Sequence, residues 1–216
     1  MKGYHSFFSI IKIIFNMEIF FISIFASHIY CQDSTGTVKD IDGNLYKTIK
    51  IGNQWWMAEN LKVTHFRNGQ SIKLVRYFNQ LIYDDYSGDS ALSDIYGYLY
   101  AEQCVLDKQC LCPLGWHIPS DDEWQILIDS LGGSLYAGGK MKEAGNSHWK
   151  IPNRGGSNIS GFNALPGGGG SNDGVGSHAY FWSSDGKIIR IIYFDYERIF
   201  RAYHSYGMKS VRCVKD

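Results

Sequence analysis

The chain has 216 residues with 21 acidic and 21 basic side chains, and neither sign forms a long run. This balance argues against an electrostatic grip on nucleic acid or on an acidic membrane surface. Its 15 Tyr, 12 Phe, 6 Trp and 24 Gly beside only 4 Pro are typical of a folded domain with many packing groups and turns, not of a disordered chain.

The N-terminal segment predicts export from the cytoplasm. Residues 19–26, IFFISIFA, form an uninterrupted apolar stretch with the length of a signal-peptide core, and they are too few to span a membrane. Lys2 and Lys12 place positive charge before this stretch. Met17 is an alternative start, and a retained anchor helix or an ordinary buried helix is the alternative interpretation of the segment.

The end of this segment sets the domain boundary. Cys31 could accept a lipid, although Tyr30 stands where a lipoprotein signal needs a very small residue. We therefore expect residues 1–31 to be a signal peptide or a lipoprotein signal, and residues 32–216 to be one extracytoplasmic domain. Membrane contact would come only from a lipid anchor or an uncleaved signal.

The cysteines support export, because four of them remain after residue 31 and an even number suits disulfides. They are Cys104, Cys110, Cys112 and Cys213, with three possible pairings. A bond between Cys112 and Cys213 would close a long loop and add about 4 kcal/mol in the chain-entropy model. Cys104 and Cys110 would form the second pair. A zinc site is less favoured, because a single residue separates Cys110 from Cys112 and no second close pair exists.

Alternating apolar and polar residues predict antiparallel strands at both ends of the domain. Residues 37–50 alternate around Asp42-Gly43-Asn44, which is the pattern of a β-hairpin with a tight turn. The aromatic residues at 96–100 predict a strand or the segment that leads into one. Three further strands are expected near the C-terminus, at residues 179–184, 188–193 and 209–214.

Two adjacent tryptophans follow the hairpin. Trp55 and Trp56 lie in the segment 51–61 beside Asn and Glu residues, a composition that could form a stacking platform for sugars. A Trp pair inside an apolar strand more often fills a core, so the core interpretation is favoured.

An acidic loop is the candidate for a metal ion. Carboxylates are concentrated between residues 83 and 94, and converging carboxylates can hold calcium outside the cell. Their spacing does not match the EF-hand ladder, so a solvated loop is the favoured interpretation. We expect no cofactor, with calcium as the alternative.

The clearest local signal is the start of a helix at Ser120. Glu123 stands three residues later, which is the spacing of a capping box. Trp124, Leu127, Ile128 and Leu131 recur at helical spacing and predict a buried stripe, and Gly132 or Gly133 would end the helix. The acidic residues of this segment are therefore expected to be caps, not catalysts. A second short helix is expected at residues 137–144.

A long glycine-rich region follows, with little room for regular structure. It covers residues 153–178 and includes the run Gly167–Gly170. A phosphate-binding loop would continue with Lys and Ser or Thr and then a helix, whereas Ser171-Asn172-Asp173 follows here. A nucleotide site is therefore not expected.

Six ordered blocks resemble the Fibrobacter succinogenes major paralogous domain, and they extend over nearly all of residues 37–216. The resemblance implies an exported bacterial protein, often surface-associated and without an established activity. The blocks are residues 38–46, 51–61, 112–120, 161–168, 181–184 and 211–216.

Residues 115–124 are also similar to sulfatase-modifying-factor domains, and this similarity implies a C-type-lectin-like fold. Their enzyme chemistry depends on copper-binding cysteines, whereas Cys112 and Cys213 are better explained as a structural bridge. The Glu-Pro-Asn and Gln-Pro-Asp motifs of calcium-dependent lectins are missing. The expected fold is α+β and C-type-lectin-like, with antiparallel sheets, one or two short helices and a long irregular glycine-rich loop region.

The expected function is a non-catalytic cell-surface module that binds a glycan or a surface protein through residues 153–180, because loops on a rigid scaffold commonly carry recognition. A structural envelope component without a small ligand is the alternative. An enzyme is the lesser alternative, since the histidines are scattered and no nucleophile motif accompanies them. The candidate contacts are Asn158, Asn172, Asp173, His178 and Tyr180.

Overall fold

The computed structural model describes residues 34–73, 83–84, 89–170, 174–204 and 206–216. By its contacts, Thr35–Asp216 forms one unit. The predicted signal segment, including Cys31, lies outside the described residues. Within the described part of the chain, no helix is both long enough and apolar enough to cross a membrane.

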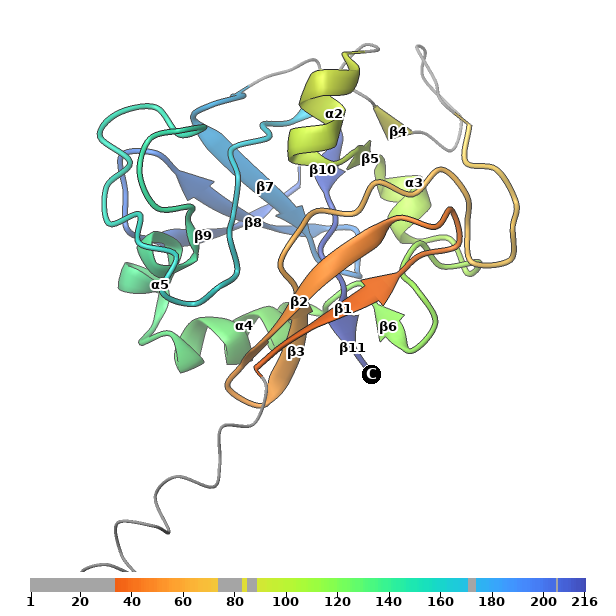
Figure 1. Cartoon of the computed structure of the whole chain (residues 1–216), viewed down its shortest axis with the longest axis horizontal. Coiled ribbons are helices and arrows are strands. Elements are labelled where there is room, and N and C mark those ends of the chain that lie inside the picture. The colour runs from red at the N-terminus through yellow and green to blue at the C-terminus, as the bar shows by residue number, and fades with distance from the viewer. Residues whose placement is uncertain (1–33, 74–82, 85–88, 171–173, 205) are drawn as a thin grey trace, which may run out of the picture. The chain divides into compact units, whose positions relative to one another are not determined.

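The predicted hairpin begins the first sheet. Asp40 accepts hydrogen bonds from the backbone N–H of Asn44 (2.9 Å) and from the hydroxyl of Tyr46 (2.6 Å), and Gly43 supplies the positive φ of 89° at the turn. The hairpin expected over residues 37–50 is therefore confirmed. In the described residues this sheet is antiparallel with the order β1-β2-β3-β11-β6 (Figure 1). Its strands are Thr35–Lys39 (β1), Leu45–Ile51 (β2), Gln54–Met57 (β3), Trp116–His117 (β6) and Val214–Lys215 (β11).

Two of the three predicted C-terminal strands, at residues 179–184 and 188–193, belong to a second sheet. The strand expected at residues 209–214 is wrong as a single element, because residues 209–210 pair in the second sheet and Val214 begins a strand of the first. The order of the second sheet over the described residues is β4-β5-β10-β7-β8-β9, where β10 and β7 run parallel and the other pairs are antiparallel. Two largely antiparallel sheets with short helices confirm the α+β class, and the arrangement is compatible with a C-type-lectin-like fold. The strands are Tyr83–Asp84 (β4), Leu99–Tyr100 (β5), His178–Trp182 (β7), Ile188–Tyr193 (β8), Ile199–Tyr203 (β9) and Lys209–Ser210 (β10).

The capped helix forms as expected. Helix α4 spans Asp121–Ser130, and Ser120 and Glu123 make both hydrogen bonds of the capping box. Trp124 and Leu127 have no exposed surface, so the predicted stripe faces the core. The acidic residues of the first turn also complement the positive end of the helix dipole.

The next helix begins earlier than expected. Helix α5 spans Ser134–Met141, not residues 137–144. The chain turns at Gly132 and Gly133 directly after α4, and Gly133 is already the N-cap residue of α5, while Lys142 leaves the helix with extended backbone. Its two internal glycines permit close packing. A Cβ on Gly138 would lie 2.7 Å from the carbonyl oxygen of Arg198, just before β9.

Two short helices were not predicted from the sequence. They are α2 (Ser90–Tyr96) and α3 (Glu102–Val105). Asp89 begins α2 by accepting hydrogen bonds from the backbone N–H groups of Ala91 (3.0 Å) and Leu92 (3.2 Å). One carboxylate of the expected solvated loop is therefore a helix cap.

The tryptophan pair packs into the interior. Trp56 has no exposed surface, and the centroid of its ring lies 4.8 Å from the ring centroid of Trp124. Trp55 is partly buried and packs against the neighbouring apolar cluster. The core interpretation is confirmed for Trp56, and the segment is not an exposed platform.

A disulfide ties the C-terminal region to the loop before β6. Cys112 and Cys213 are bonded across a sequence separation of 101 residues, and both are buried. The possible second pair, Cys104 with Cys110, is not formed. Cys104 lies in α3 with no exposed surface, whereas Cys110 is exposed in the following turn, so the two side chains occupy different environments.

Candidate functional site

One of the predicted loop contacts supports another residue of the loop. Asn158 accepts a hydrogen bond from the backbone N–H of Asn163 (2.8 Å) and donates its amide to the Asn163 side-chain oxygen (3.2 Å). Asn158 therefore fixes the conformation of Asn163, which has a left-handed φ of 53°. Asn172 and Asp173 lie outside the described residues.

The other two predicted contacts lie together on β7. The rings of His178 and Tyr180 are stacked with centroids 5.6 Å apart, and the ammonium of Lys209 lies 5.3 Å from the Tyr180 centroid. Both rings are only partly exposed. The ring of Tyr180 is therefore largely engaged by protein groups.

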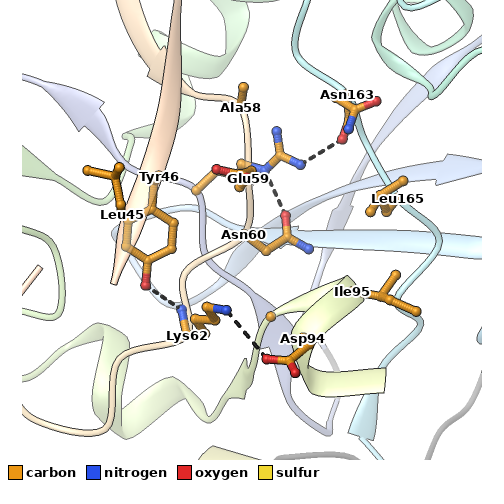
Figure 2. Close-up of a pocket in the computed structure, with 12 residues that line it drawn as sticks. Leu45, Tyr46, Ala58, Glu59, Asn60, Lys62, Asp94, Ile95, Asn163 and Leu165 are labelled. Atoms are coloured by element: carbon orange, nitrogen blue, oxygen red, sulfur yellow. Dashed lines mark hydrogen bonds and ion pairs between the residues drawn. The ribbon is translucent and has the colours of Figure 1, made fainter. Parts of the chain in front are cut away.

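A small cleft lies where the Asn163 segment meets two other parts of the chain (Figure 2). We call it the polar cleft. Its volume is ≈ 110 Å³, well below the roughly 300–1,000 Å³ of pockets that enclose a whole drug-sized ligand. It would therefore hold one small unit of a larger ligand. It is lined by Leu45, Tyr46, Ala58, Glu59, Asn60, Lys62, Asp94, Ile95, Gly97, Asn163, Leu165 and Arg212.

Close backbone packing builds the cleft. The end of α2 approaches the segment after β3 because Gly97 has no side chain there: a Cβ would lie 2.9 Å from the carbonyl oxygens of both Asn60 and Leu61. The side-chain amide of Asn60 also donates to the carbonyl of Tyr96 (2.8 Å). These contacts place the last turn of α2, with Asp94 and Ile95, at the cleft (Figure 2).

Arg212 is the buried cation of the cleft, with 1% of its surface exposed. Its Nε donates to the side-chain oxygen of Asn60 (2.7 Å), Nη1 donates to the carbonyls of Met57 (3.3 Å) and Phe162, and Nη2 donates to the carbonyl of Asn163 (3.0 Å). Burial lowers the pKa of Arg212, and the charge of Glu59 opposes this shift. The guanidinium therefore links Asn60, after β3, to the backbone of Asn163, and both residues line the cleft.

Four polar side chains of the cleft retain hydrogen-bonding capacity toward a ligand. Glu59 uses one oxygen to accept from the backbone N–H of Lys47 (2.6 Å), which leaves the other oxygen. Lys62 and Asp94 form a loose ion pair at 3.5 Å with Asp94 largely exposed (Figure 2). Asn163 receives a hydrogen bond on its oxygen, which leaves its side-chain NH₂ as a donor. Donors and acceptors are therefore both present within one small cleft.

Exposed apolar side chains complete the cleft. Leu45 is 63% exposed and Ile95 is 41% exposed, and Leu165 is partly buried beside them. Large exposed aliphatic side chains beside free polar groups are typical of binding surfaces, where one part of the ligand is apolar and another makes hydrogen bonds.

His117 is held by a carboxylate on each ring nitrogen. Its Nδ1 lies 2.6 Å from Asp216 Oδ1, and its Nε2 lies 2.8 Å from Glu123 Oε1. Partial burial by itself lowers the pKa of His117, but the hydrogen bonds and charges of Asp216 and Glu123 outweigh it, so the net shift is upward. The imidazole ring therefore joins the start of α4 to the chain after β11, with both ring nitrogens engaged by carboxylates.

We expect this contact to make stability depend on pH. The folded-state pKa of His117 is raised, so its contribution is complete below the unfolded value near 6.5 and is lost as the pH rises through the folded-state value. The group is partly exposed, so His117→Gln should lower the melting temperature by only about 2 °C at pH 5.5 and by less at pH 8.5. Thermal melts of both proteins at the two pH values test this, and a difference that grows with pH would contradict it.

The described residues of the acidic segment have other roles than metal binding. Asp89 caps α2 and Asp94 pairs with Lys62, while residues 85–88 lie outside the described residues. Within the parts of the chain that can be described, no group of three or more His, Cys, Asp or Glu side chains could hold a metal ion.

The polar cleft was not predicted from the sequence. Glu59 and Asn60 lie in the segment that contains the two tryptophans, and Arg212 lies in the last apolar block beside Cys213. Arg212 itself was an available signal, because it is a charged residue inside the apolar run Val211-Arg212-Cys213-Val214 and such a charge must find partners when buried.

A known family matches most of the chain. The family described as Fibrobacter succinogenes major domain matches residues 49–215. No curated protein and no solved structure matches. The matched range contains Glu59, Asp94, Asn163 and Arg212, and it begins after the Leu45 side of the cleft.

Proposed function

The chain belongs to the Fibrobacter succinogenes major domain family, and because this membership assigns no activity, we propose from the polar cleft that it is an exported, non-catalytic surface module that binds a glycan. The observation that carries the proposal is the set of free donors and acceptors beside exposed aliphatic side chains in a cleft sized for one small unit. Export is part of the same proposal and is supported by the apolar segment before residue 31 and by the disulfide.

The charges of the cleft favour an uncharged ligand. Glu59 and Asp94 are balanced by Lys62 and Arg212, so no net field selects an anion or a cation. Sugar hydroxyls are both donors and acceptors, and they match carboxylate oxygens, an amide NH₂ and an ammonium group in the same space. The C–H face of a sugar ring would contact the aliphatic side chains of the cleft, which are Leu45, Ile95 and Leu165.

Asn158, in the predicted recognition region, has a supporting role in this proposal. The predicted recognition region 153–180 contributes Asn163 and Leu165 to the cleft, and Asn158 holds Asn163 in its left-handed conformation. A rigid donor costs less conformational entropy on binding than a mobile one.

An enzyme remains the lesser alternative. Ser177 is a serine in contact with His178 (3.0 Å), but it is buried and its hydroxyl also lies 3.1 Å from the carbonyl of Gly174, as a donor to it. This hydroxyl is not placed to attack a ligand. A structural envelope component without a ligand is the other alternative, and it predicts no saturable binding at all.

We expect the oxidised protein to bind some members of a panel of soluble glycans and insoluble polysaccharides. The double variant Glu59→Gln, Asn163→Ala should bind the same glycans at least about tenfold more weakly, because two hydrogen bonds to the ligand are changed. The amide oxygen introduced at position 59 could still accept the Lys47 N–H. Alanine at position 163 must adopt the left-handed φ of 53°, so we expect a lower melting temperature but a folded sample. Equilibrium binding with and without a calcium chelator, and melting temperature, are the measurements.

The matched control exchanges similar residue types outside the cleft. Asp122 and Asn146 are exposed, and Asp122→Asn with Asn146→Ala should bind like the wild type. Equal loss in both double variants, or no binding by a folded sample, would reject the glycan proposal. Binding abolished by the chelator would instead point to calcium in the acidic segment.

A further inference from the structure

An exposed thiol lies next to the disulfide in the sequence. Cys110 is exposed and is not part of a disulfide, and only Leu111 separates it from Cys112, which is buried in its bond to Cys213. Cys110 also has a φ of 59°, in the left-handed region that non-glycine residues rarely adopt. An exposed thiol beside a structural disulfide is the arrangement from which thiol–disulfide exchange proceeds.

The local geometry permits an alternative pair. Cα atoms two residues apart are separated by at most about 7 Å, and disulfides join Cα atoms about 4.4–6.8 Å apart. The length of chain between Cys110 and Cys112 therefore permits a bond between them when the turn rearranges. Cys104 is a poorer competitor, because it is buried in α3 with no exposed surface.

Arg67 holds this turn independently of the C-terminal strand. Its backbone N–H donates to the carbonyl of Cys110 (2.9 Å), and its guanidinium donates to the carbonyls of Cys112 (3.0 Å), Pro113 (3.0 Å) and Trp116 (2.6 Å). These four contacts do not involve the segment around Cys213. The turn that carries Cys110 and Cys112 can therefore stay in place when that segment separates.

We propose that Cys110 is an exchange thiol for the Cys112–Cys213 bond. The Cys110 thiolate attacks Cys112 Sγ, the Cys110–Cys112 bond forms, and the Cys112–Cys213 bond breaks with Cys213 leaving as a thiolate. The reverse attack by Cys213 restores the native bond and releases Cys110. No electrons are gained or lost, so no external oxidant or reductant is needed. This proposal is independent of the ligand of the polar cleft.

Native packing decides the direction of exchange. With Val211, Cys213 and Val214 buried, the packed segment holds Cys213 beside Cys112, and burial of both sulfurs slows attack on the long-range bond. When this segment opens, native contacts no longer hold Cys213 beside Cys112, whereas Cys110 remains two residues away in the sequence. The C-terminal segment would thus lose its covalent tie on opening and regain it on docking.

Partial denaturation of the purified, oxidised protein tests the proposal. We would incubate it in mildly alkaline buffer with denaturant below the global midpoint, quench with acid, alkylate the free thiols and map the bonds by mass spectrometry. The expected result is a Cys110–Cys112 bond that forms at least about tenfold faster than any bond to Cys104, with Cys213 alkylated in the same molecules.

Two single variants serve as controls. Cys110→Ser should retain the Cys112–Cys213 bond throughout the incubation, whereas Cys104→Ala should exchange like the wild type. The proposal is overturned if the rearranged bond appears only above the global unfolding midpoint, if bonds to Cys104 form equally fast, or if wild type and Cys110→Ser release Cys213 at the same rate.

Discussion

Removal of the Cys112–Cys213 bond is expected to lower the free energy of unfolding by about 4–5 kcal/mol, because its loop is about 100 residues long and the bond restricts the unfolded chain most strongly at such lengths. The bond joins the loop before β6 to the segment before β11, and both strands belong to the first sheet. In the native state the backbone carbonyl of Cys213 also accepts from Met57 (3.0 Å), so the covalent tie reinforces an existing sheet contact.

The double variant Cys112→Ala, Cys213→Ala measures this effect. Urea denaturation of the variant and the wild type should show a lower midpoint, and the melting temperature should fall by roughly 10–15 °C. Cys110→Ser is the control, since it removes a cysteine without removing the bond and should lie within about 1 kcal/mol of the wild type. A loss below about 1 kcal/mol in the double variant would show that noncovalent contacts alone hold the C-terminal strand.

Local signals in the sequence predicted local structure well. Ser120 and Glu123 fix the start of α4, because the two hydrogen bonds of the capping box depend only on their spacing. Asp42-Gly43-Asn44 indicated the hairpin for a similar reason, since a tight turn needs the positive φ that Gly43 adopts. In both cases the interacting groups lie within a few residues of one another.

Short helices and the polar cleft could not be found in this way. Helix α2 depends on Asp89, and an aspartate in an acidic segment has the same local pattern whether it caps a helix or faces solvent. The cleft joins residues as distant as Glu59, Asp94 and Asn163, and nothing in any one segment indicates the others. Predicting it requires the packing that brings the end of α2 onto Asn60, which rests on the missing side chain of Gly97.

The second large effect is expected for Arg212→Met, which should lower the free energy of unfolding by about 3 kcal/mol. The substitution leaves the side-chain oxygen of Asn60 and the carbonyls of Phe162 and Asn163 without their donor, and each unsatisfied buried acceptor costs about 1–3 kcal/mol. It also removes contacts with the Phe162 ring, whose centroid lies 4.3 Å from the guanidinium carbon. Release from burying a charge offsets part of this loss.

Arg212→Lys separates the charge of this residue from its shape. Lysine keeps a positive charge but cannot reach Asn60, Phe162 and Asn163 together, because an ammonium lacks the planar fork of a guanidinium. We therefore expect Arg212→Lys to be no more stable than Arg212→Met in urea denaturation. The control is Arg198→Met, at an exposed arginine over Phe200, which should change the free energy of unfolding by less than about 1 kcal/mol.

If lysine instead restored most of the stability, charge balance with Glu59 would be the dominant role of Arg212. If both variants lose stability equally, the guanidinium acts as a geometric link that positions Asn163 in the cleft. In that case both should also bind the glycan more weakly under conditions in which they remain folded.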